Sequence, residues 1–231
     1  AAGDAIAAAF ARRLPCSEFP PEPVSCGKRM LDEATAYELF QRVGISHAPI
    51  TVLDVNAPVP ELPFPYPVVA KVLHAKIAHK TDVGGVVLNI RHAEELTSAL
   101  SRIRANVELH RPGTVVEKVL VQSMTKGLGE VLVGYRRDPQ VGPIVILAAG
   151  GVLTEIYRDR SIRLAPVEVE TAREMIAEVR ALKALAGYRG HPEGDLEALA
   201  ETVAAVSRLA TLSDLAVQEA EINPGMVLEK G

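Results

Sequence analysis

Short apolar runs rich in valine, isoleucine and leucine recur along the chain, and most of them are bounded by glycine or proline. Runs of this length predict β-strands, because branched side chains pack well on a pleated surface and glycine or proline ends the pairing. We expect strands at residues 49–53, 67–73, 83–90, 114–124, 129–135, 144–148 and 217–222. The fold is therefore expected to contain substantial β-sheet.

Longer segments between these runs carry apolar residues at helical spacing. We expect helices at residues 31–43, 92–110, 168–186 and 195–212, with Gly44 ending the first. Helices and strands are mixed without a strict β-α-β alternation. This order favours an α+β fold in two lobes over a doubly wound sheet.

The composition argues against two classes of partner. With 231 residues, 48% of them hydrophobic, the chain can bury a core, but its net charge of -4 gives no general attraction to nucleic acid or anionic membranes. Trp is absent and aromatic residues make up 4%, so the stacking platforms of single-strand binders are missing. The longest apolar run, residues 141–153, is interrupted by glycine and proline and is too short to span a bilayer. We expect no nucleic acid and no membrane segment.

The first 27 residues differ in composition from the rest of the chain. An Ala-rich, helical piece is expected to end near Leu14, followed by a Pro-rich linker, so the compact domain is expected at residues 28–231. The start of the chain lacks the leading positive charge of a signal peptide, and Cys16 and Cys26 lack ligand-spaced histidines. We therefore expect a cytoplasmic protein, and an initial Ala is compatible with a piece of a longer one.

A lysine at the end of an apolar strand and a glycine loop suggest phosphate binding. Lys71 lies in the strand at residues 67–73, and the loop HKTDVGG, residues 79–85, follows. Ammonium groups supply the charge that a triphosphate needs, and glycine lets backbone N–H groups approach an anion. Neither GxxxxGK[ST] nor a strand followed by GxGxxG is present, so another architecture would hold the nucleotide. A tight hairpin with solvated lysines explains the loop equally well.

Two further places carry polar residues that packing does not require. Glu221 and Asn223 lie two residues apart on a strand and can present oxygens to one hard cation such as Mg²⁺, although Asn before Pro224 is also a common turn. Residues 119–134 read as two strands joined by a short polar loop, and a bare hairpin explains most of this segment. Glu130, at the start of the otherwise apolar second strand, is not required by a hairpin and could reach a ribose or order a lysine.

These motifs together resemble the ATP-grasp family, specifically the branch of ADP-forming acetyl-CoA synthetases and succinyl-CoA synthetase β chains. The likeness covers residues 28–227, and its most specific segments, in order, are VVAKVLHAKIAHKTDVGGV, GEVLVGYRRDPQVGPIVILAAGGVLTEI, RLAP and EINP. It implies an ATP-grasp fold of two α+β lobes with the nucleotide between them. The smaller lobe would be about residues 48–121, and the larger lobe residues 28–47 with 122–231.

The resemblance also implies a role for each candidate residue. Lys71 and Lys80 would contact the phosphates of ATP or ADP, Gly84 and Gly85 would form a backbone cradle, and Glu130 would lie beside the nucleotide. Backbone groups of the connecting strand would hold adenine, here Gln122, Ser123, Met124 and Thr125. Glu221 and Asn223 would bind Mg²⁺. The family continues to another acidic ligand, whereas this chain stops at Gly231, so the pair is expected to be an incomplete set.

The family reaction interconverts acid, CoA and ATP with acyl-CoA, ADP and phosphate through an acyl phosphate and a phosphohistidine. That phosphohistidine and the CoA site belong to another domain or an α-type subunit, so this acid-thiol ligase is expected to need such a partner. His79 matches a second histidine that is phosphorylated in some members, which makes it a catalytic candidate with Lys80 and Glu130. The other histidines are expected at the surface or in packing.

Two other functions fit the same fold. One is a ligand-sensing ATP-grasp module fused to an acyltransferase, without synthetase activity. The retention of Lys71, Lys80, Glu130, Glu221 and Asn223 argues against such a loss. The other is a different ATP-grasp carboxylate ligase, which HKTDVGG and RDPQVGP fit less well.

Overall fold

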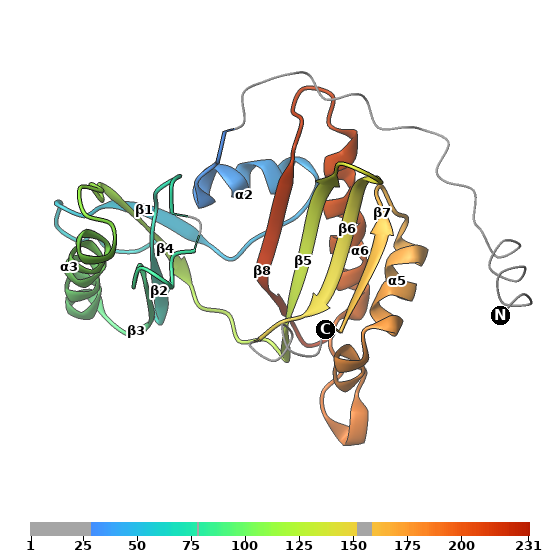
Figure 1. Ribbon diagram of the computed structural model, residues 1–231. Helices are drawn as coiled ribbons and strands as arrows, with labels where there is room; N and C mark the ends of the chain where they lie inside the picture. The colour runs from blue at the N-terminus through green and yellow to red at the C-terminus, as the bar shows by residue number, and fades with distance from the viewer. Residues whose placement is uncertain (1–28, 78, 152–158) are drawn as a thin grey trace, which may run out of the picture.

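In a computed structural model of the protein, described for residues 29–77, 79–151 and 159–231, two separate antiparallel sheets organise the chain (Figure 1). Sheet A has the strand order β1-β4-β2-β3, and sheet B has the order β7-β6-β5-β8. Helices and sheets are mixed, as predicted. The helix expected before Leu14 lies outside the described residues.

Sheet A takes its strands from residues 50–123. They are β1 (Ile50–Asp54), β2 (Val68–Val72), β3 (Val86–Ile90) and β4 (Lys118–Ser123). Helix α3 (Ala93–His110) crosses one face, where Leu96, Ile103 and Val107 are completely buried. They pack in one cluster with the buried strand residues Val68 and Val72, which places a continuous apolar core beneath β2.

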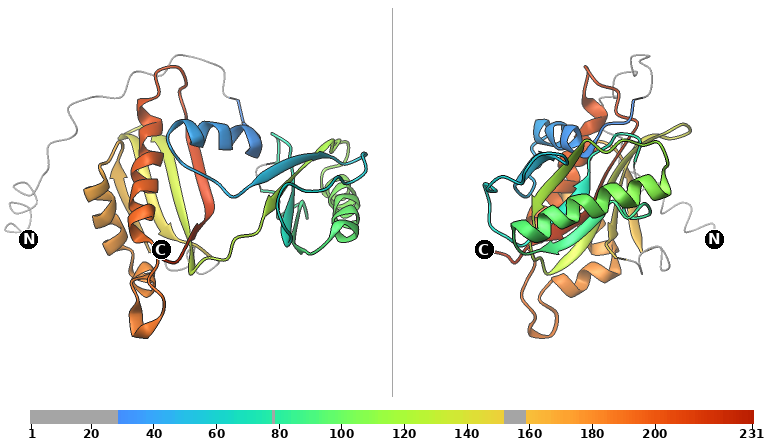
Figure 2. Two further views of the ribbon diagram at one scale, coloured as in Figure 1. Left: turned by 180° about the vertical axis from the view of Figure 1, so that it is seen from behind. Right: turned by 90° about the vertical axis from the view of Figure 1, so that its left-hand side faces the viewer.

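Sheet B consists of β5 (Gly129–Asp138), β6 (Gly142–Ala149), β7 (Arg160–Leu164) and β8 (Glu219–Val227). Helices α5 (Val169–Glu178) and α6 (Leu196–Ser207) cover one face, as seen from behind in Figure 2. Val133, Tyr135 and Leu147 turn toward these helices and are at most 1% exposed. Because strand residues alternate between faces, the side chains between them lie on the face that α5 and α6 leave uncovered.

Helix α2 (Glu33–Arg42) lies between β8 and sheet A (Figure 1). Asp32 caps its start by accepting from the Thr35 N–H at 2.9 Å, and Gly44 leaves the helix with a φ of +90°. Leu39 and Phe40 are buried in the core of sheet B. The N-terminal end of the helix, which begins with Glu33, faces sheet A.

The predicted helix at residues 168–186 is wrong in its second half. After α5, Val179 is extended, and a 3₁₀ helix, η1 (Arg180–Leu185), begins instead. The Asp159 carboxylate accepts from the backbone N–H groups of Arg180 and Ala181 at 3.1 and 2.8 Å. A side chain remote in sequence therefore caps a new helix where continuation of the old one was expected.

Several strand boundaries also differ from those predicted. β3 begins at Val86 because residues 80–85 form a turn, and β4 begins at Lys118 after a turn at Gly113. β8 continues through Asn223 and Pro224, where its register with β5 shifts, so this segment is a strand irregularity and the turn interpretation is wrong. β7 was not predicted as a strand, because its two arginines interrupt the run of apolar residues by which the other strands were recognised. Two further 3₁₀ helices in the described residues are η2 (Tyr188–Gly190) and η3 (Arg208–Thr211).

No helix in the part of the chain that the structure describes is both long and apolar enough to cross a membrane. The expected boundaries of the two lobes, at residues 48 and 122, stay a prediction.

Candidate functional site

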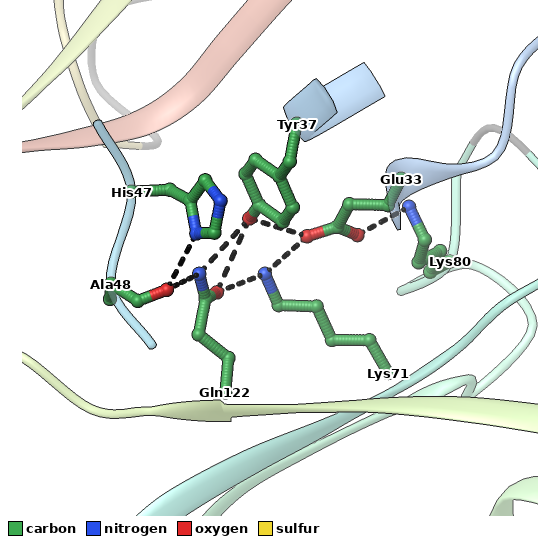
Figure 3. A network of polar contacts seen from close by, with 7 residues as sticks. All are labelled: Glu33, Tyr37, His47, Ala48, Lys71, Lys80 and Gln122. Atoms are coloured by element: carbon green, nitrogen blue, oxygen red, sulfur yellow. Dashed lines mark hydrogen bonds and ion pairs between the residues drawn. The ribbon is translucent and has the colours of Figure 1, made fainter. Parts of the chain in front are cut away.

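Two predicted phosphate-binding lysines meet at one carboxylate (Figure 3). Lys71 Nζ, from near the end of β2, lies 2.7 Å from Glu33 Oε1, and Lys80 Nζ, from the loop before β3, lies 2.9 Å from Glu33 Oε2. The three side chains are only 16 to 22% exposed. A strand and a loop thus supply a compact pair of ammonium groups, and the start of α2 supplies the carboxylate between them.

Gln122 and Tyr37 extend this cluster. Lys71 Nζ donates to Gln122 Oε1 at 3.0 Å, and Gln122 Nε2 donates to the Tyr37 hydroxyl at 3.1 Å. The Tyr37 hydroxyl donates to Glu33 Oε1 at 2.9 Å. His47 stacks on the Tyr37 ring with a centroid separation of 4.3 Å, in a packing role. Each polar group in the cluster is therefore held by neighbours from other elements.

The cluster favours an ionised Glu33. Burial alone would raise the pKa of its carboxyl, but the charges and hydrogen bonds of Lys71 and Lys80 outweigh burial and lower this pKa below its ordinary value of 4.5. Burial and the neighbouring Glu33 carboxylate raise the pKa of Tyr37, so its hydroxyl remains a donor. Glu33 is thus a fixed anion and Tyr37 a fixed neutral donor at neutral pH.

The glycine loop is a tight, internally bonded turn. The Gly84 N–H donates to the Thr81 carbonyl at 3.0 Å, and the Gly85 N–H donates to the Lys80 carbonyl at 2.8 Å. Gly84 has a φ of +61°, and a Cβ on Gly85 would lie 2.6 Å from Val72 Cγ1. Glycine is required here for the turn itself. The role of these two N–H groups as a phosphate cradle stays a prediction, since both already have an acceptor.

His79 and the connecting segment each adjoin a member of this cluster in the sequence, Lys80 and Gln122 respectively. His79 is exposed, directly before Lys80. The N–H groups of Ser123 and Met124 donate to the carbonyls of Pro49 and Pro67 at 3.0 and 3.1 Å. If residues 122–125 hold adenine, they would therefore use other backbone groups, and the side chain of Gln122 belongs to the lysine cluster.

The other predicted residues lie on sheet B. In the register of β5 and β8, Glu221 is opposite Gly134, on the uncovered face that also carries Glu130. Asn223 Nδ2 donates to Glu221 Oε1 at 3.0 Å, so the predicted metal pair is in direct contact. Both residues are exposed. Their oxygens suit a hard cation such as Mg²⁺, and the Asn223 amide would have to rotate for its oxygen to reach the same ion as Glu221.

Acidic ligand clusters of the usual size are not found elsewhere. Within residues 29–77, 79–151 and 159–231, no group of three or more His, Cys, Asp or Glu side chains could hold a metal ion. Glu221 and Asn223 therefore remain a sparse pair, which matches the way Mg²⁺ takes its remaining oxygens from water and phosphates.

Glu33 and Tyr37 were not predicted as site residues. In the sequence, Glu33 is an ordinary acidic residue in the first turn of a helix, and Tyr37 is one of its apolar positions. Glu33 is 38 residues from Lys71 along the chain, so no local spacing connects them. The contact depends on how α2 packs against sheet B and reaches sheet A.

Comparison with known proteins gives consistent results. The model of the ATP-grasp domain family matches residues 23–231. The chain is 43% identical over 166 residues to acetate–CoA ligase [ADP-forming] I of Archaeoglobus fulgidus, and this match covers 72% of the chain and 24% of that protein. It is 42% identical over 159 residues to the β subunit of acetate–CoA ligase [ADP-forming] I of Pyrococcus furiosus, covering 69% of the chain and 68% of the subunit.

Solved structures agree with the sequence relatives. The dinucleotide forming acetyl-coenzyme A synthetase 1 of Ca. Korarchaeum cryptofilum, in complex with coenzyme A and Ca-AMPCP, matches with a TM-score of 0.78 and 34% identity, over 89% of this chain and 90% of that one. Another structure of that enzyme contains coenzyme A and Mg-AMPPCP and has its phosphohistidine segment pointing towards the nucleotide binding site, with a TM-score of 0.71 and 33% identity over 88% of this chain and 89% of that one. The chain thus spans about a quarter of the first, single-chain relative and about two thirds of the separate β subunit.

Proposed function

We propose that this chain, which belongs to the ATP-grasp domain family, supplies the ATP-binding and phosphoryl-transfer part of an ADP-forming acyl-CoA synthetase. The whole enzyme would convert a carboxylic acid, CoA and ATP into acyl-CoA, ADP and phosphate. The observation that carries the proposal is the convergence of Lys71 and Lys80 on one point, in a chain whose relatives are ADP-forming acetate–CoA ligases.

The two lysines suit the phosphates of ATP or ADP. Lys71 is fixed on β2 by its neighbours in sheet A and by Gln122, while Lys80 lies in the turn that ends at Gly85. Ammonium groups held in a partly buried site bind phosphate oxygens more strongly than solvated ones, because less water competes. We infer that these side chains orient the phosphates and stabilise charge as phosphoryl transfer proceeds.

Glu221 and Asn223 are the residues that would hold Mg²⁺, with Glu130 on the same face of sheet B beside the nucleotide. When bound, the ion would supply positive charge that offsets the negative charge of the phosphates. The contact between the Asn223 amide and Glu221 keeps these two side chains adjacent, and it would be replaced by the ion once the Asn223 oxygen turns toward it.

A partner is needed for the remaining chemistry. The Pyrococcus relative is named a β subunit, and one structure of the Korarchaeum enzyme has its phosphohistidine segment pointing towards the nucleotide binding site. We infer that a CoA-binding, phosphohistidine-bearing domain or α-type subunit approaches this chain, and that the exposed His79 receives or passes on the phosphoryl group. A histidine on a moving segment can carry that group between distant sites without loss to water.

The histidine step has a direct test. The chain is incubated with γ-labelled ATP, Mg²⁺ and the partner half, and label on each protein is followed in the wild type, in His79→Ala and in the control His110→Ala. His110 is also exposed, but it lies at the end of α3, the helix that covers one face of sheet A. We expect label on the partner to fall sharply only with His79→Ala. Equal labelling with all three proteins would reduce His79 to a loop residue, and absence of label with the wild type would contradict the proposed function.

A further inference from the structure

The carboxylate of Glu33 forms ion pairs with the ammonium groups of Lys71 and Lys80. The proposed function assigns these same two groups to binding phosphate. Each oxygen of Glu33 takes one lysine, at 2.7 Å for Lys71 and 2.9 Å for Lys80 (Figure 3). Phosphate and carboxylate oxygens seek the same kind of contact with ammonium donors. In this structure Glu33 is therefore chemically similar to an anionic ligand of the lysine pair.

Glu33 is well held as an anion. It is the first residue of α2, where the helix dipole favours negative charge, and the Tyr37 hydroxyl donates to it from one turn further along. Its side chain is only 16% exposed, so water cannot readily replace the lysines. The start of α2 thus places the Glu33 carboxylate, oriented by Tyr37, between Lys71 and Lys80.

The two lysines are not held equally. Lys71 projects from a central strand and also donates to Gln122 at 3.0 Å. Lys80 lies in a turn, and its ammonium group contacts Glu33. Lys80 is therefore the group that can change partner with little change in the sheet.

We propose that Glu33 is an internal competitor of the nucleotide phosphates, holding Lys80 while the site is empty and releasing it to phosphate when nucleotide binds. This inference rests on the proposed function, because it assumes that phosphates bind at Lys71 and Lys80. The physical reason is repulsion between like charges. Phosphate oxygens that bind the two lysines must approach the negative Glu33 carboxylate, which opposes their binding unless Lys80 leaves Glu33 for the phosphate. Glu33 thereby sets nucleotide affinity without taking part in the chemistry.

The test compares the binding of MgADP to the wild type and to Glu33→Gln by calorimetry. Glutamine keeps the shape and an acceptor oxygen but removes the charge. We expect MgADP to bind about tenfold more tightly to Glu33→Gln, since a repulsive charge within a few ångströms of the phosphates is lost. Glu38→Gln is the matched control: it removes the same charge from an exposed position on the same helix, and its affinity should equal that of the wild type.

Hydrogen exchange distinguishes competition from simple structural support. Without nucleotide, residues 80–85 should exchange faster in Glu33→Gln, because Lys80 has lost its ion pair. With saturating MgADP both proteins should exchange at the same rate, because phosphate then holds Lys80 in each. A difference that persists unchanged in the bound state would overturn the inference in favour of a purely structural role.

A second variant covers the case in which Glu33→Gln does not fold. Glu33→Asp keeps the charge and shortens the side chain by one methylene, so it cannot reach both lysines as Glu33 does, and we expect a smaller gain in MgADP affinity. Affinity equal to or weaker than that of the wild type in every folded variant would overturn the inference. If the folded wild type itself binds no MgADP, the proposed function fails instead, and the two failures are thus distinguishable.

Discussion

Lys71 is the residue whose side chain should contribute most directly to nucleotide binding, because its position is fixed by β2 and by Gln122. We expect Lys71→Ala to weaken MgADP binding by about 10- to 100-fold, the loss of one charge-assisted hydrogen bond. Lys118→Ala, on the exposed side of β4 in the same sheet, is the control and should leave the affinity unchanged. Calorimetry on the two variants checks the prediction, and similar affinities for both would remove Lys71 from the site.

The Glu33 cluster also predicts how stability depends on pH. The pKa of Glu33 in the folded protein lies below its ordinary value of 4.5, because the two lysines outweigh the effect of burial. The unfolded state therefore takes up a proton first as the pH falls. The stabilising contribution of Glu33 is present above the ordinary pKa and is lost as the pH falls through the lower, folded value.

Urea unfolding at a series of pH values measures this effect. The difference in unfolding free energy between the wild type and Glu33→Gln should be constant near neutral pH and should shrink below about pH 4.5 as the carboxylate is protonated. A difference that stays constant down to pH 3 or so, where the unfolded carboxyl is protonated, would show that the lysines do not hold Glu33 as an anion.

At the level of the elements, α2 is the one that most directly links the two sheets at the site. Its Phe40 lies in the core of sheet B, and Arg42 binds Asp214 at 2.8 Å near the end of the 3₁₀ helix η3. Its other end contacts Lys71 of sheet A and Lys80 of the loop before β3 through Glu33. Helix α2 therefore connects the core of sheet B to the lysine pair.

The turn that carries Lys80 depends on close packing at Gly85. A Cβ there would lie 2.6 Å from Val72 Cγ1 and 3.0 Å from the Lys80 carbonyl. We expect Gly85→Ala to destabilise the protein by about 1–3 kcal/mol through overpacking, and to weaken nucleotide binding by shifting Lys80. Gly134→Ala, whose Cβ would meet its nearest atoms at 3.6 and 3.8 Å, is the control. Urea unfolding decides, and equal stability of the two variants would mean that the turn adjusts freely.

Element types were predictable where a segment's own sequence decides them. Gly44 follows the end of α2, as expected, and the apolar runs at β1, β2, β5 and β6 form strands. The prediction failed where a distant group decides, as when Asp159 caps η1 and ends the expected long helix. β7 was missed because Arg160 and Arg163 interrupt its apolar period, although it pairs along β6 as an edge strand.

For the whole molecule, the sequence indicates which residues could bind phosphate but not how the fold assembles them. Lys71 and Lys80 are candidates because of their charge near a glycine loop, and in the structure both contact Glu33. The anion between them could not be predicted, because Glu33 reaches them only through the packing of α2. The glycine loop also differs from what its sequence suggests. Its pattern is typical of phosphate-binding loops, but its glycine N–H groups donate to carbonyls of the turn itself.

The distribution of polar residues over both sheets fits an enzyme part that binds one ligand from two sides. Lys71 comes from sheet A and Lys80 from the loop between two of its strands, whereas Glu130, Glu221 and Asn223 lie on sheet B. The relatives support this interpretation, because ATP-grasp enzymes solved with bound nucleotide analogues match this chain over about nine tenths of its length.

The measurement that tests the central proposal most directly is product analysis in a reconstituted reaction. The chain is combined with a CoA-binding, phosphohistidine-bearing half, a small carboxylic acid, CoA, ATP and Mg²⁺, and nucleotides and thioesters are quantified together. We expect acyl-CoA and ADP in equal amounts, and no acyl-CoA from either half alone. Formation of AMP with the thioester, or of acyl-CoA by this chain without the partner, would contradict the account.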